Sequence, residues 1–364
     1  MGADTEAGRL RYAAPTDLGP FAVGHTVFEA TDAARDGRTL RVEMWYPAEE
    51  TAEGDPTFYD FQFFGLGLTS PVSIEDAPVT GFVGLPLVVF SHGNCGVSFQ
   101  STPLMEMLAS HGFFVVAPNH TGNSVNECIG TSGPDPFEVS ARNRPLDVSF
   151  LIDLLTARSR DPADPLYARI NERQIGVAGH SFGGYTALAM ASGIEDASLG
   201  DAIPPDRRVR AIAPIAPASR FFDDAELAGI AVPTLLLVGS EDSTTPVDDN
   251  VTRPWALIGA SAVYRAEIVG AEHLHFANAC DIAQALSDFG VSESGIARLV
   301  PGYFETCGAG AFPIADARRI ANLYVTAFFK RHLLDDRRYD DFLTTGYAAA
   351  NEPDVAFQRK DEPR

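Results

Sequence analysis

Residues 174–190 have the sequence QIGVAGHSFGGYTALAM, in which an apolar run leads into a Gly-x-Ser-x-Gly pentapeptide centred on Ser181. The apolar run predicts a short buried strand, and the residues after the pentapeptide predict a helix. A serine on such a sharp strand-to-helix turn has a strained backbone and a projecting hydroxyl, and glycines on both sides leave the space that the turn needs. The N-terminus of the following helix favours negative charge that develops nearby. We therefore expect Ser181 to be a nucleophile, with a plain turn as the alternative.

Strands and helices alternate along the rest of the chain. The runs LVVF at 87–90 and LLLV at 235–238 are continuously apolar, as is typical of strands covered by helices on both faces. The expected strands are 27–30 and 40–46 (a hairpin around Asp36-Gly37), 85–90, 113–117, 174–178, 209–213, 234–238 and 262–268; the expected helices are 99–110, 146–157, the stretch after Ser181, and 314–334. This order predicts an α/β fold with a mostly parallel central sheet flanked by helices, and with ligands bound at the carboxyl ends of the strands.

A single domain is expected over residues 1–350 of the 364. A chain of this length can bury one large core. The Pro- and Gly-rich segments 47–84 and 118–145 are too short to be domains and predict excursions over the sheet edge. Residues 351–364 are charged and predict a flexible C-terminal tail.

The charge balance is strongly acidic, with 49 Asp and Glu against 27 Lys and Arg, a net charge of −22. Such a surface disfavours a polyanionic partner such as nucleic acid, and it leaves adaptation to high salt open. No apolar stretch approaches the length of a membrane span, so no integral membrane segment is expected. The opening residues, MGADTE, lack the features of a secretory signal. The chain is therefore expected to be a soluble cytoplasmic protein, and its oligomeric state is left open.

Four cysteines occur, at Cys95, Cys128, Cys280 and Cys307. None forms a Cys-x-x-Cys pair, so a zinc site is not expected. Sequence alone does not separate three possible disulfide connectivities from four free thiols. If they pair, Cys95–Cys128 and Cys280–Cys307 would each join loops that are expected to be neighbours. Paired cysteines would favour an exported protein, in conflict with the missing signal.

A serine hydroxyl becomes a nucleophile only when a base removes its proton, and a carboxylate must orient that base. The expected chain order is serine, acid, histidine. The loop GSEDSTTP after strand 234–238 places Asp242, and the loop GAEHLHF after strand 262–268 places His273, at the sheet edge that carries Ser181. We expect Asp242 and His273 to be the acid and the base. Competitors remain: Glu241, Asp248 and Asp249 for the acid (with Asp242 then only capping a turn), and His275 for the base.

Ester chemistry also needs two hydrogen-bond donors for the oxyanion. One is the backbone N–H of Phe182, directly after the serine, and the other is expected from the loop SHGNCG at 91–96, where the N–H of Asn94 is the candidate. A simple glycine turn is the alternative for that loop. His92 is expected to support the loop, and His180 to orient the turn at the serine.

Several further motifs together resemble one branch of a known superfamily. They are DGRTL at 36–40, WYP at 45–47, VFSHG at 89–93, LASHGF at 108–113, APNHTG at 117–122, RPLDV at 144–148 and GHSFGG at 179–184. The chain resembles the serine-dependent, dienelactone-hydrolase-like branch of the α/β-hydrolases, which includes the platelet-activating factor acetylhydrolases. The resemblance spans residues 19–335.

The resemblance implies an α/β-hydrolase fold and ester hydrolysis through Ser181, Asp242 and His273, with Phe182 and Asn94 as oxyanion donors. Two departures matter. The position after His92-Gly93 is often apolar in relatives. Asn94 is polar, so we expect that its side chain can also contact the substrate. The dienelactone hydrolases themselves use a cysteine nucleophile, so their substrate is not carried over.

The expected activity is that of a serine carboxylic-ester hydrolase acting through an acyl-enzyme on short-chain or aromatic esters, without a metal or organic cofactor. The alternatives are a phospholipid hydrolase like the platelet-activating factor acetylhydrolases, a cutinase-like polyester hydrolase, and an acyltransferase. A catalytically silent binding module is hard to reconcile with three filled triad positions. The residues expected to line the substrate pocket, with core packing as the alternative, are Phe61, Phe63, Phe64, Phe182, His275 and Phe276.

Overall fold

The computed structural model describes residues 12–61, 65–131, 133–196 and 200–360. The strands are β1 (Val23–Asp32), β2 (Arg38–Pro47), β3 (Pro56–Asp60), β4 (Gly67–Glu75), β5 (Leu85–Ser91), β6 (Phe114–Pro118), β7 (Ile170–His180), β8 (Val209–Ile215), β9 (Thr234–Gly239), β10 (Val263–Ile268) and β11 (Val355–Lys360). The helices are α1 (Thr102–Ser110), α2 (Val125–Ile129), α3 (Phe137–Arg160), α4 (Phe182–Ser192), α5 (Asp224–Ala228), α6 (Arg253–Leu257), α7 (Ala279–Asp288), α8 (Glu293–Leu299), α9 (Tyr303–Cys307), α10 (Ile314–Leu334) and α11 (Thr345–Asn351).

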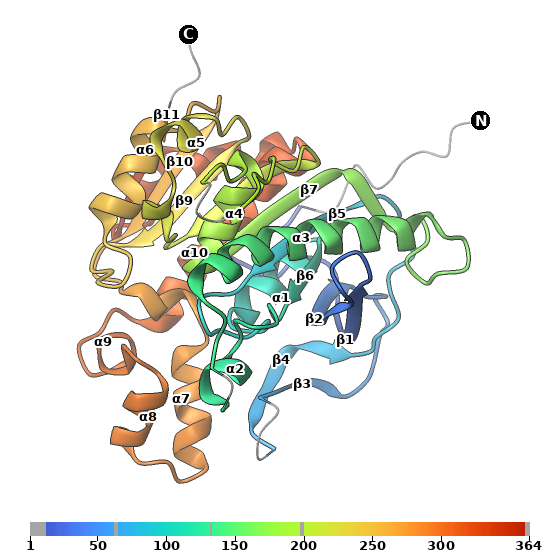
Figure 1. Ribbon diagram of the computed structural model, residues 1–364, viewed down its shortest axis with the longest axis horizontal. Helices are drawn as coiled ribbons and strands as arrows, with labels where there is room; N and C mark the ends of the chain where they lie inside the picture. Colours follow the sequence, from blue (N-terminus) through green and yellow to red (C-terminus); the bar gives the residue numbers. More distant parts are fainter. Residues whose placement is uncertain (1–11, 62–64, 132, 197–199, 361–364) are drawn as a thin grey trace.

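The strands form one sheet in the order β11-β10-β9-β8-β7-β5-β6-β2-β1-β4-β3 (Figure 1). Its centre, from β6 to β10, is parallel, whereas β2 and β11 flank that centre with antiparallel pairing. The mostly parallel sheet predicted from the apolar runs is therefore confirmed. Parallel strands place all their carboxyl ends at one edge, where loops from different strands meet.

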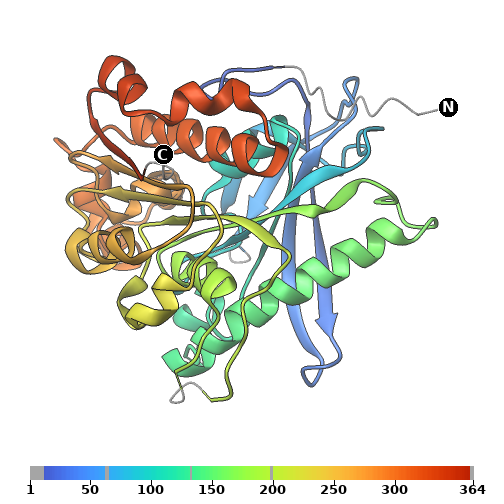
Figure 2. The same cartoon turned by 90° about the horizontal axis from the view of Figure 1, so that it is seen from above.

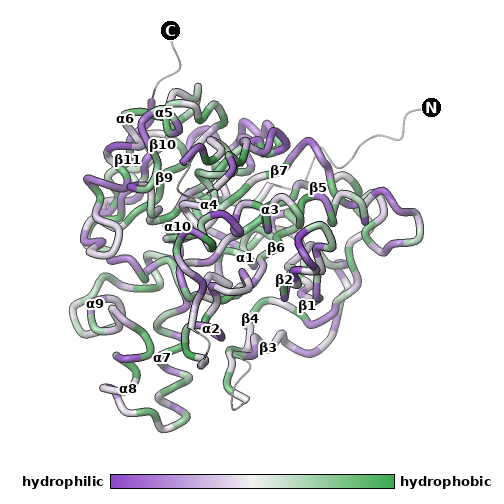
Figure 3. Tube along the Cα trace, viewed as in Figure 1, coloured by the Kyte–Doolittle hydropathy of each residue, from purple (hydrophilic) through white to green (hydrophobic). Residues whose placement is uncertain are grey.

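The central strands of the sheet are buried because both faces of the sheet are covered there. Along β5, Leu87 and Val89 belong to one hydrophobic core, whereas Val88 and Phe90 belong to the other. This alternation follows from the period of two residues in a strand. Helices α3 and α4 cover one face, and α1 and α10 cover the opposite face (Figure 2). Green hydrophobic stretches mark the middle of the sheet in Figure 3, as a doubly covered sheet requires.

The hairpin of β1 and β2 turns at Asp36 and Gly37, which both have positive φ values, 53° and 72°. Glycine adopts such angles without steric cost, and aspartate tolerates them better than most residues. The predicted hairpin is confirmed.

Two expectations about the sheet are corrected. The segment 47–84 is not only an excursion, because its β3 and β4 extend the sheet beyond β1. Residues 355–360, expected to lie in a flexible tail, form β11, which pairs antiparallel with β10 and buries Val355 and Phe357. The tail orders because β10 would otherwise leave an unpaired edge. Residues 361–364 lie outside the described part of the chain.

Helices α7, α8 and α9 lie together to one side of the sheet, beyond the loop that follows β10 (Figure 1). These three helices were not predicted from the sequence. A disulfide between Cys280 and Cys307 joins α7 to α9, and a second disulfide joins Cys95 to Cys128. Both pairings are those predicted from loop proximity. Within the described residues, no helix combines the length and the apolarity that crossing a bilayer requires.

Candidate active site

Ser181 occupies a sharp turn between β7 and α4. Its backbone has φ 59° and ψ −116°, a conformation that L-residues rarely adopt. The turn is held by hydrogen bonds from Ser181 N to Ile215 O, 2.9 Å, and from Ala218 N to Ser181 O, 3.1 Å. A Cβ atom at Gly179 or Gly183 would collide with backbone oxygen atoms. The glycines of the pentapeptide are therefore required by close backbone approach, as the sequence pattern predicts.

Asp242 and His273 come together at the carboxyl ends of β9 and β10. His273 Nδ1 lies 2.7 Å from Asp242 Oδ2, and both side chains are largely buried. The competing acids Glu241, Asp248 and Asp249 are exposed. Among the acids that the sequence left open, the structure thus places Asp242 against His273.

The Asp242 carboxylate accepts three further hydrogen bonds within its own loop. Oδ1 accepts from Thr244 N and Thr245 N at 3.0 and 2.7 Å, and Thr245 Oγ1 lies 2.9 Å from Oδ2. Burial opposes ionisation of this carboxyl group, but the bond from His273 and these donors hold its pKa below the usual value. The acid is therefore a preorganised anion, and Thr245, which the sequence analysis did not single out, is one of its supports.

His180 and Gln100 link the serine turn to its surroundings. His180 Nε2 lies 2.9 Å from His273 O, and Gln100 Nε2 lies 2.9 Å from His180 Nδ1. Burial, together with the nearby His273, lowers the pKa of His180 to about 3, so its ring is neutral at physiological pH. His180 holds the backbone at His273 and does not titrate in the physiological range, as expected. Gln100 was missed because nothing in the local sequence signals its role.

The loop after β5 passes directly beside the serine. A Cβ atom at Gly93 would lie 3.4 Å from the Ser181 Cβ, and Gly93 N donates to Gln100 Oε1 over 2.9 Å. Asn94 follows and is exposed to the cavity. Phe182 is the first residue of α4 and directly follows Ser181, and its ring is buried against Phe137. Both expected oxyanion donors therefore belong to segments adjacent to Ser181.

A cavity of about 620 Å³ opens above these loops. It is lined by Gly93, Asn94, Gln100, His180, Ser181 and His273, with Ser243, Thr244, Glu272 and Glu305 among its other polar residues. Its apolar lining is aliphatic, from Val97, Val125, Leu274, Ile282, Leu299, Val300 and Pro301. Helices α7 and α9 and the loop between α8 and α9 form one wall. Ser181 and His273 therefore line one cavity.

The comparisons with known proteins agree with this architecture. A family model described as "Alpha/beta hydrolase family" matches residues 88–227, which contain Ser181 and Asn94 but neither Asp242 nor His273. A ferulic acid esterase from Streptomyces cinnamoneus is structurally similar, with a TM-score of 0.67 and 24% sequence identity, over 95% of this chain and 98% of that chain. No curated protein sequence matches the chain. The chain has the α/β-hydrolase fold.

Within this hydrolase fold, the expected substrate-contacting aromatic residues lie elsewhere. His275 is fully buried: its Nδ1 accepts from Glu272 N, and its Nε2 donates to Phe312 O. Phe276 packs in the core beside His180, and Phe61 stacks on Phe99. The expectation that His275 and Phe276 bind substrate is therefore corrected, because the turn after His273 directs both side chains inward.

Two further residues of that expectation, Phe63 and Phe64, lie outside the described residues. Phe182 contributes its ring to the core on the α3–α4 side of the sheet and does not line the cavity. Among the described residues that line the cavity, none is Phe, Tyr or Trp. The described lining is thus aliphatic where the sequence analysis anticipated aromatic rings.

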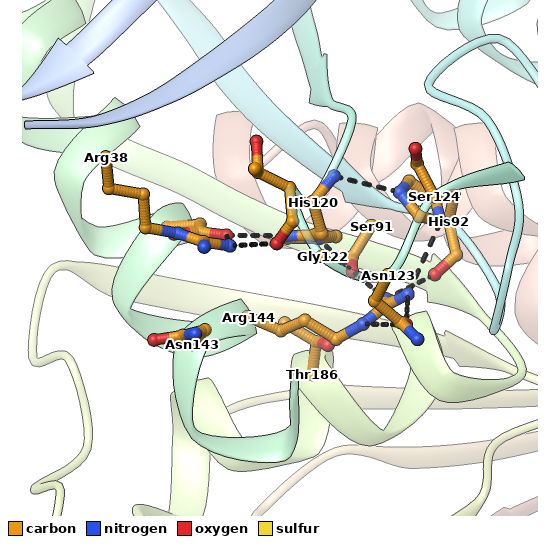
Figure 4. A network of polar contacts seen from close by, with 12 residues as sticks. Arg38, Ser91, His92, His120, Gly122, Asn123, Ser124, Asn143, Arg144 and Thr186 are labelled. Carbon is orange, nitrogen blue, oxygen red and sulfur yellow. Dashed lines mark hydrogen bonds and ion pairs between the residues drawn. The ribbon is translucent and has the colours of Figure 1, made fainter. Parts of the chain in front are cut away.

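A second polar network lies beneath the loop after β5 (Figure 4). Ser91 Oγ lies 2.9 Å from His120 Nε2, and His120 Nδ1 lies 2.9 Å from Asp147 Oδ2. All three side chains are buried, and Asp147 also forms ion pairs with Arg35 and Arg38. The network joins β5, β6 and α3, whose residues are far apart in the sequence. All of its members except Arg35 occur in the quoted motifs, but the motifs alone do not show that they meet.

Proposed function

We propose that the chain is a serine carboxylic-ester hydrolase that works through an acyl-enzyme. The observation that carries this proposal is the 2.7 Å contact of buried Asp242 with His273, which lines the same cavity as Ser181 on its strained turn. A base oriented by a carboxylate, next to a projecting serine, is the arrangement that acyl transfer uses on several unrelated folds.

In the proposed first step, Ser181 Oγ attacks the ester carbonyl carbon while His273 Nε2 takes the hydroxyl proton. Asp242 accepts a hydrogen bond from the Nδ1–H of His273, which fixes the tautomer and stabilises the imidazolium. The N–H groups of Phe182 and Asn94 stabilise the oxyanion, and the helix N-terminus at Phe182 adds its dipole. The carbonyl then re-forms, and His273 donates its proton to the departing alcohol.

In the second step, His273 removes a proton from a water molecule, whose oxygen attacks the acyl-enzyme carbonyl. The same donors stabilise the second oxyanion. Collapse releases the carboxylic acid, and the proton returns from His273 to Ser181 Oγ.

The proposed substrates are small neutral esters, short-chain or aromatic. The aliphatic lining at Val125, Ile282 and Leu299 suits a short hydrocarbon group, whereas the carboxylates of Glu272 and Glu305 disfavour an anionic substrate. The ferulic acid esterase with the same fold supports the aromatic class. Comparing kcat/KM for p-nitrophenyl butyrate and methyl ferulate separates the two classes.

The proposal is tested with p-nitrophenyl acetate and a fluorophosphonate probe. We expect a burst of p-nitrophenol and covalent labelling of the parent protein, and neither with Ser181→Ala. Ser243→Ala, which removes another serine of the same cavity, is the matched control and should keep the label. A protein without burst or label is no serine hydrolase. Transfer of the acyl group to an added alcohol in preference to water would instead identify an acyltransferase.

We also propose that the protein works in an oxidising compartment. The pairs Cys95–Cys128 and Cys280–Cys307 support this, because disulfides persist mainly where thiols are not kept reduced. Each bridge is expected to stabilise the fold by about 2–4 kcal/mol. Thiol titration of the denatured, non-reduced protein purified from its native source should find no free thiol, and four free thiols would contradict the proposal.

A further inference from the structure

Arg144 in α3 is a fully buried cation beneath the loop after β5 (Figure 4). Its Nη1 donates to His92 O over 2.6 Å, and its Nη2 donates to Gly93 O over 2.9 Å. Nη2 and Nε also donate to Asn123 Oδ1, at 2.6 and 3.0 Å, and Nη1 lies 3.3 Å from Ser91 Oγ. The guanidinium group is therefore directed at the backbone that precedes Asn94.

Within the described residues, no carboxylate forms an ion pair with this guanidinium. Asp147, three residues further along α3, is paired instead with Arg35, Arg38 and His120. Burial lowers the pKa of Arg144 to about 9, so the group remains cationic at neutral pH. The charge of Asp147 acts on Arg144 from a distance and only partly opposes this shift. Burying a charge that has no directly paired carboxylate is unfavourable, and a well-packed apolar side chain would avoid that cost. Stability alone thus gives no reason for a cation at this position.

The position of the Arg144 hydrogen bonds gives a chemical reason for a cation beneath this loop. The carbonyl of Gly93 and the N–H of Asn94 are the two ends of one peptide group. Gly93 O accepts hydrogen bonds from Arg144 Nη2 and from His92 Nδ1, the latter over 2.7 Å. Donors on the carbonyl end polarise a peptide group and make its N–H a stronger donor at the other end. The cation therefore strengthens the group that is expected to receive the oxyanion.

The same side chain contacts the supports of both expected oxyanion donors. Asn123 accepts from Arg144 and donates from Nδ2 to Asn94 Oδ1 over 2.9 Å. On its other side, the guanidinium carbon of Arg144 lies 4.4 Å from the ring centroid of Phe182. One rigid group thus sets the relative position of the two segments that carry the N–H groups.

We propose that Arg144 is a positioning residue for the oxyanion hole: it orients and polarises the Gly93–Asn94 peptide group and adds its buried positive charge beneath the developing oxyanion. This inference rests on the proposed hydrolase function. In this proposal, the cation stabilises the transition state, in which negative charge appears on the substrate oxygen. The Arg144 side chain itself does not contact the substrate. Its loss therefore acts on kcat and leaves KM almost unchanged.

The test compares Arg144→Met and Arg144→Lys with the parent in p-nitrophenyl acetate hydrolysis. Losing an oxyanion donor lowers kcat by about 100-fold or more, so we expect about that loss for the Met variant, with KM within about threefold. Lysine keeps the charge but not the planar arrangement of donors. The kcat of the Lys variant should therefore be about tenfold higher than that of the Met variant. A Met variant with kcat within about threefold of the parent would overturn the proposal.

A second readout separates positioning from general structural support. A trifluoromethyl ketone forms an oxyanion when Ser181 adds to it, whereas the product alcohol binds without one. The Met variant should lose affinity for the ketone in proportion to its kcat/KM and keep its affinity for the alcohol. Equal losses for both ligands would contradict the positioning role.

Lys330→Met is the matched control. Lys330 is equally buried, and its Nζ donates to a backbone carbonyl, His111 O, but it does not line the cavity. This variant should change thermal stability and leave kcat within about twofold. Should Arg144→Met not fold, as judged by circular dichroism, the Lys variant decides: a kcat about tenfold below the parent supports the proposal, and one within about twofold contradicts it. Ser181→Ala tests the hydrolase function separately. If the Ser181→Ala variant still hydrolysed p-nitrophenyl acetate, the proposed function would be refuted, whatever the result for the Arg144 variants.

Discussion

Among the described residues, two histidine–aspartate pairs have nearly the same contact distance, and of their four residues His273 alone lines the cavity. His273 Nδ1 lies 2.7 Å from Asp242 Oδ2, and His120 Nδ1 lies 2.9 Å from Asp147 Oδ2. The second pair even has a serine, since Ser91 Oγ lies 2.9 Å from His120 Nε2. Judged by residue types and distances alone, the buried set is the more complete of the two.

The surroundings of the two serines differ. Ser91 ends a regular strand and is fully buried, whereas Ser181 has a positive φ at a turn and lines the cavity. A substrate carbonyl can approach only the latter. Phe182, one of the expected oxyanion donors, directly follows Ser181, and the loop at Gly93 that carries the other passes beside it.

The electrostatics of the buried pair also oppose a catalytic role for His120. Burial and the nearby Arg144 lower the pKa of His120 to about 4, although Asp147 opposes this shift. Asp147 resists ionisation through burial, yet Arg38 and His120 hold its pKa well below the usual value. A histidine so reluctant to take a proton is a poor general base near neutral pH. The comparison teaches that a matching set of residue types does not by itself make a candidate site, and that access to the cavity distinguishes Ser181 from Ser91.

The serines separate the two sets most strongly. Ser181→Ala should lower kcat by several powers of ten, because it removes the hydroxyl that is proposed to form the acyl-enzyme. Ser91→Ala should keep at least about a tenth of the parental kcat and lose ~1–3 kcal/mol of stability, since His120 Nε2 loses its partner. Ester hydrolysis and urea unfolding measure the two effects. A folded Ser91→Ala protein with the greater loss of kcat would reverse the assignment.

The two aspartates should differ in the property that they affect. Asp242→Asn should lower kcat by about three to four powers of ten, because the imidazole loses the group that fixes its tautomer. Asp147→Asn should act on stability, by ~3–5 kcal/mol, because it leaves buried cationic partners uncompensated. Glu241→Gln, at the exposed neighbour of Asp242, is the control and should change kcat little. A larger kcat loss from the Glu241 variant would identify the wrong acid.

The buried histidine should make the fold sensitive to acid. Since the folded pKa of His120 is lowered from 6.5 to about 4, the unfolded chain binds more protons between those values, and stability falls as the pH drops through that window. From about pH 7.5 to pH 5 this one group should remove roughly 2 kcal/mol. In His120→Gln, urea unfolding at the two pH values should show a difference smaller by that amount. An unchanged difference would mean that His120 takes up its proton without unfolding.

The smallest expected effects concern the groups that support each carboxylate. Thr245→Val removes the hydroxyl 2.9 Å from Asp242 Oδ2 and should lower kcat by about tenfold or less, consistent with ~1 kcal/mol for one hydrogen bond. Arg38→Gln breaks the bidentate contact to Asp147 and should change the unfolding midpoint but not kcat. Kinetics and thermal unfolding of both variants provide the check. Equal kcat losses would show that the two networks are coupled.

The amino-acid sequence by itself determined the central sheet and the position of the candidate nucleophile. Continuously apolar runs such as 87–90 and 235–238 are typical of strands that are covered on both faces. The glycines around Ser181 and the strand before it define the turn locally, within a few residues. The loops of Asp242 and His273 follow neighbouring parallel strands, so their meeting at one edge also follows from strand order.

Only the tertiary structure decided what depends on contacts between distant segments. It selected Asp242 over three exposed acids, turned His275 into the core and added residues 355–360 to the sheet edge. It also brought Arg144 beneath the loop at Gly93, which lies 51 residues earlier in the chain. The physical reason is that local patterns specify burial and backbone conformation, whereas the partner of a polar side chain is set by packing between elements that the sequence keeps apart.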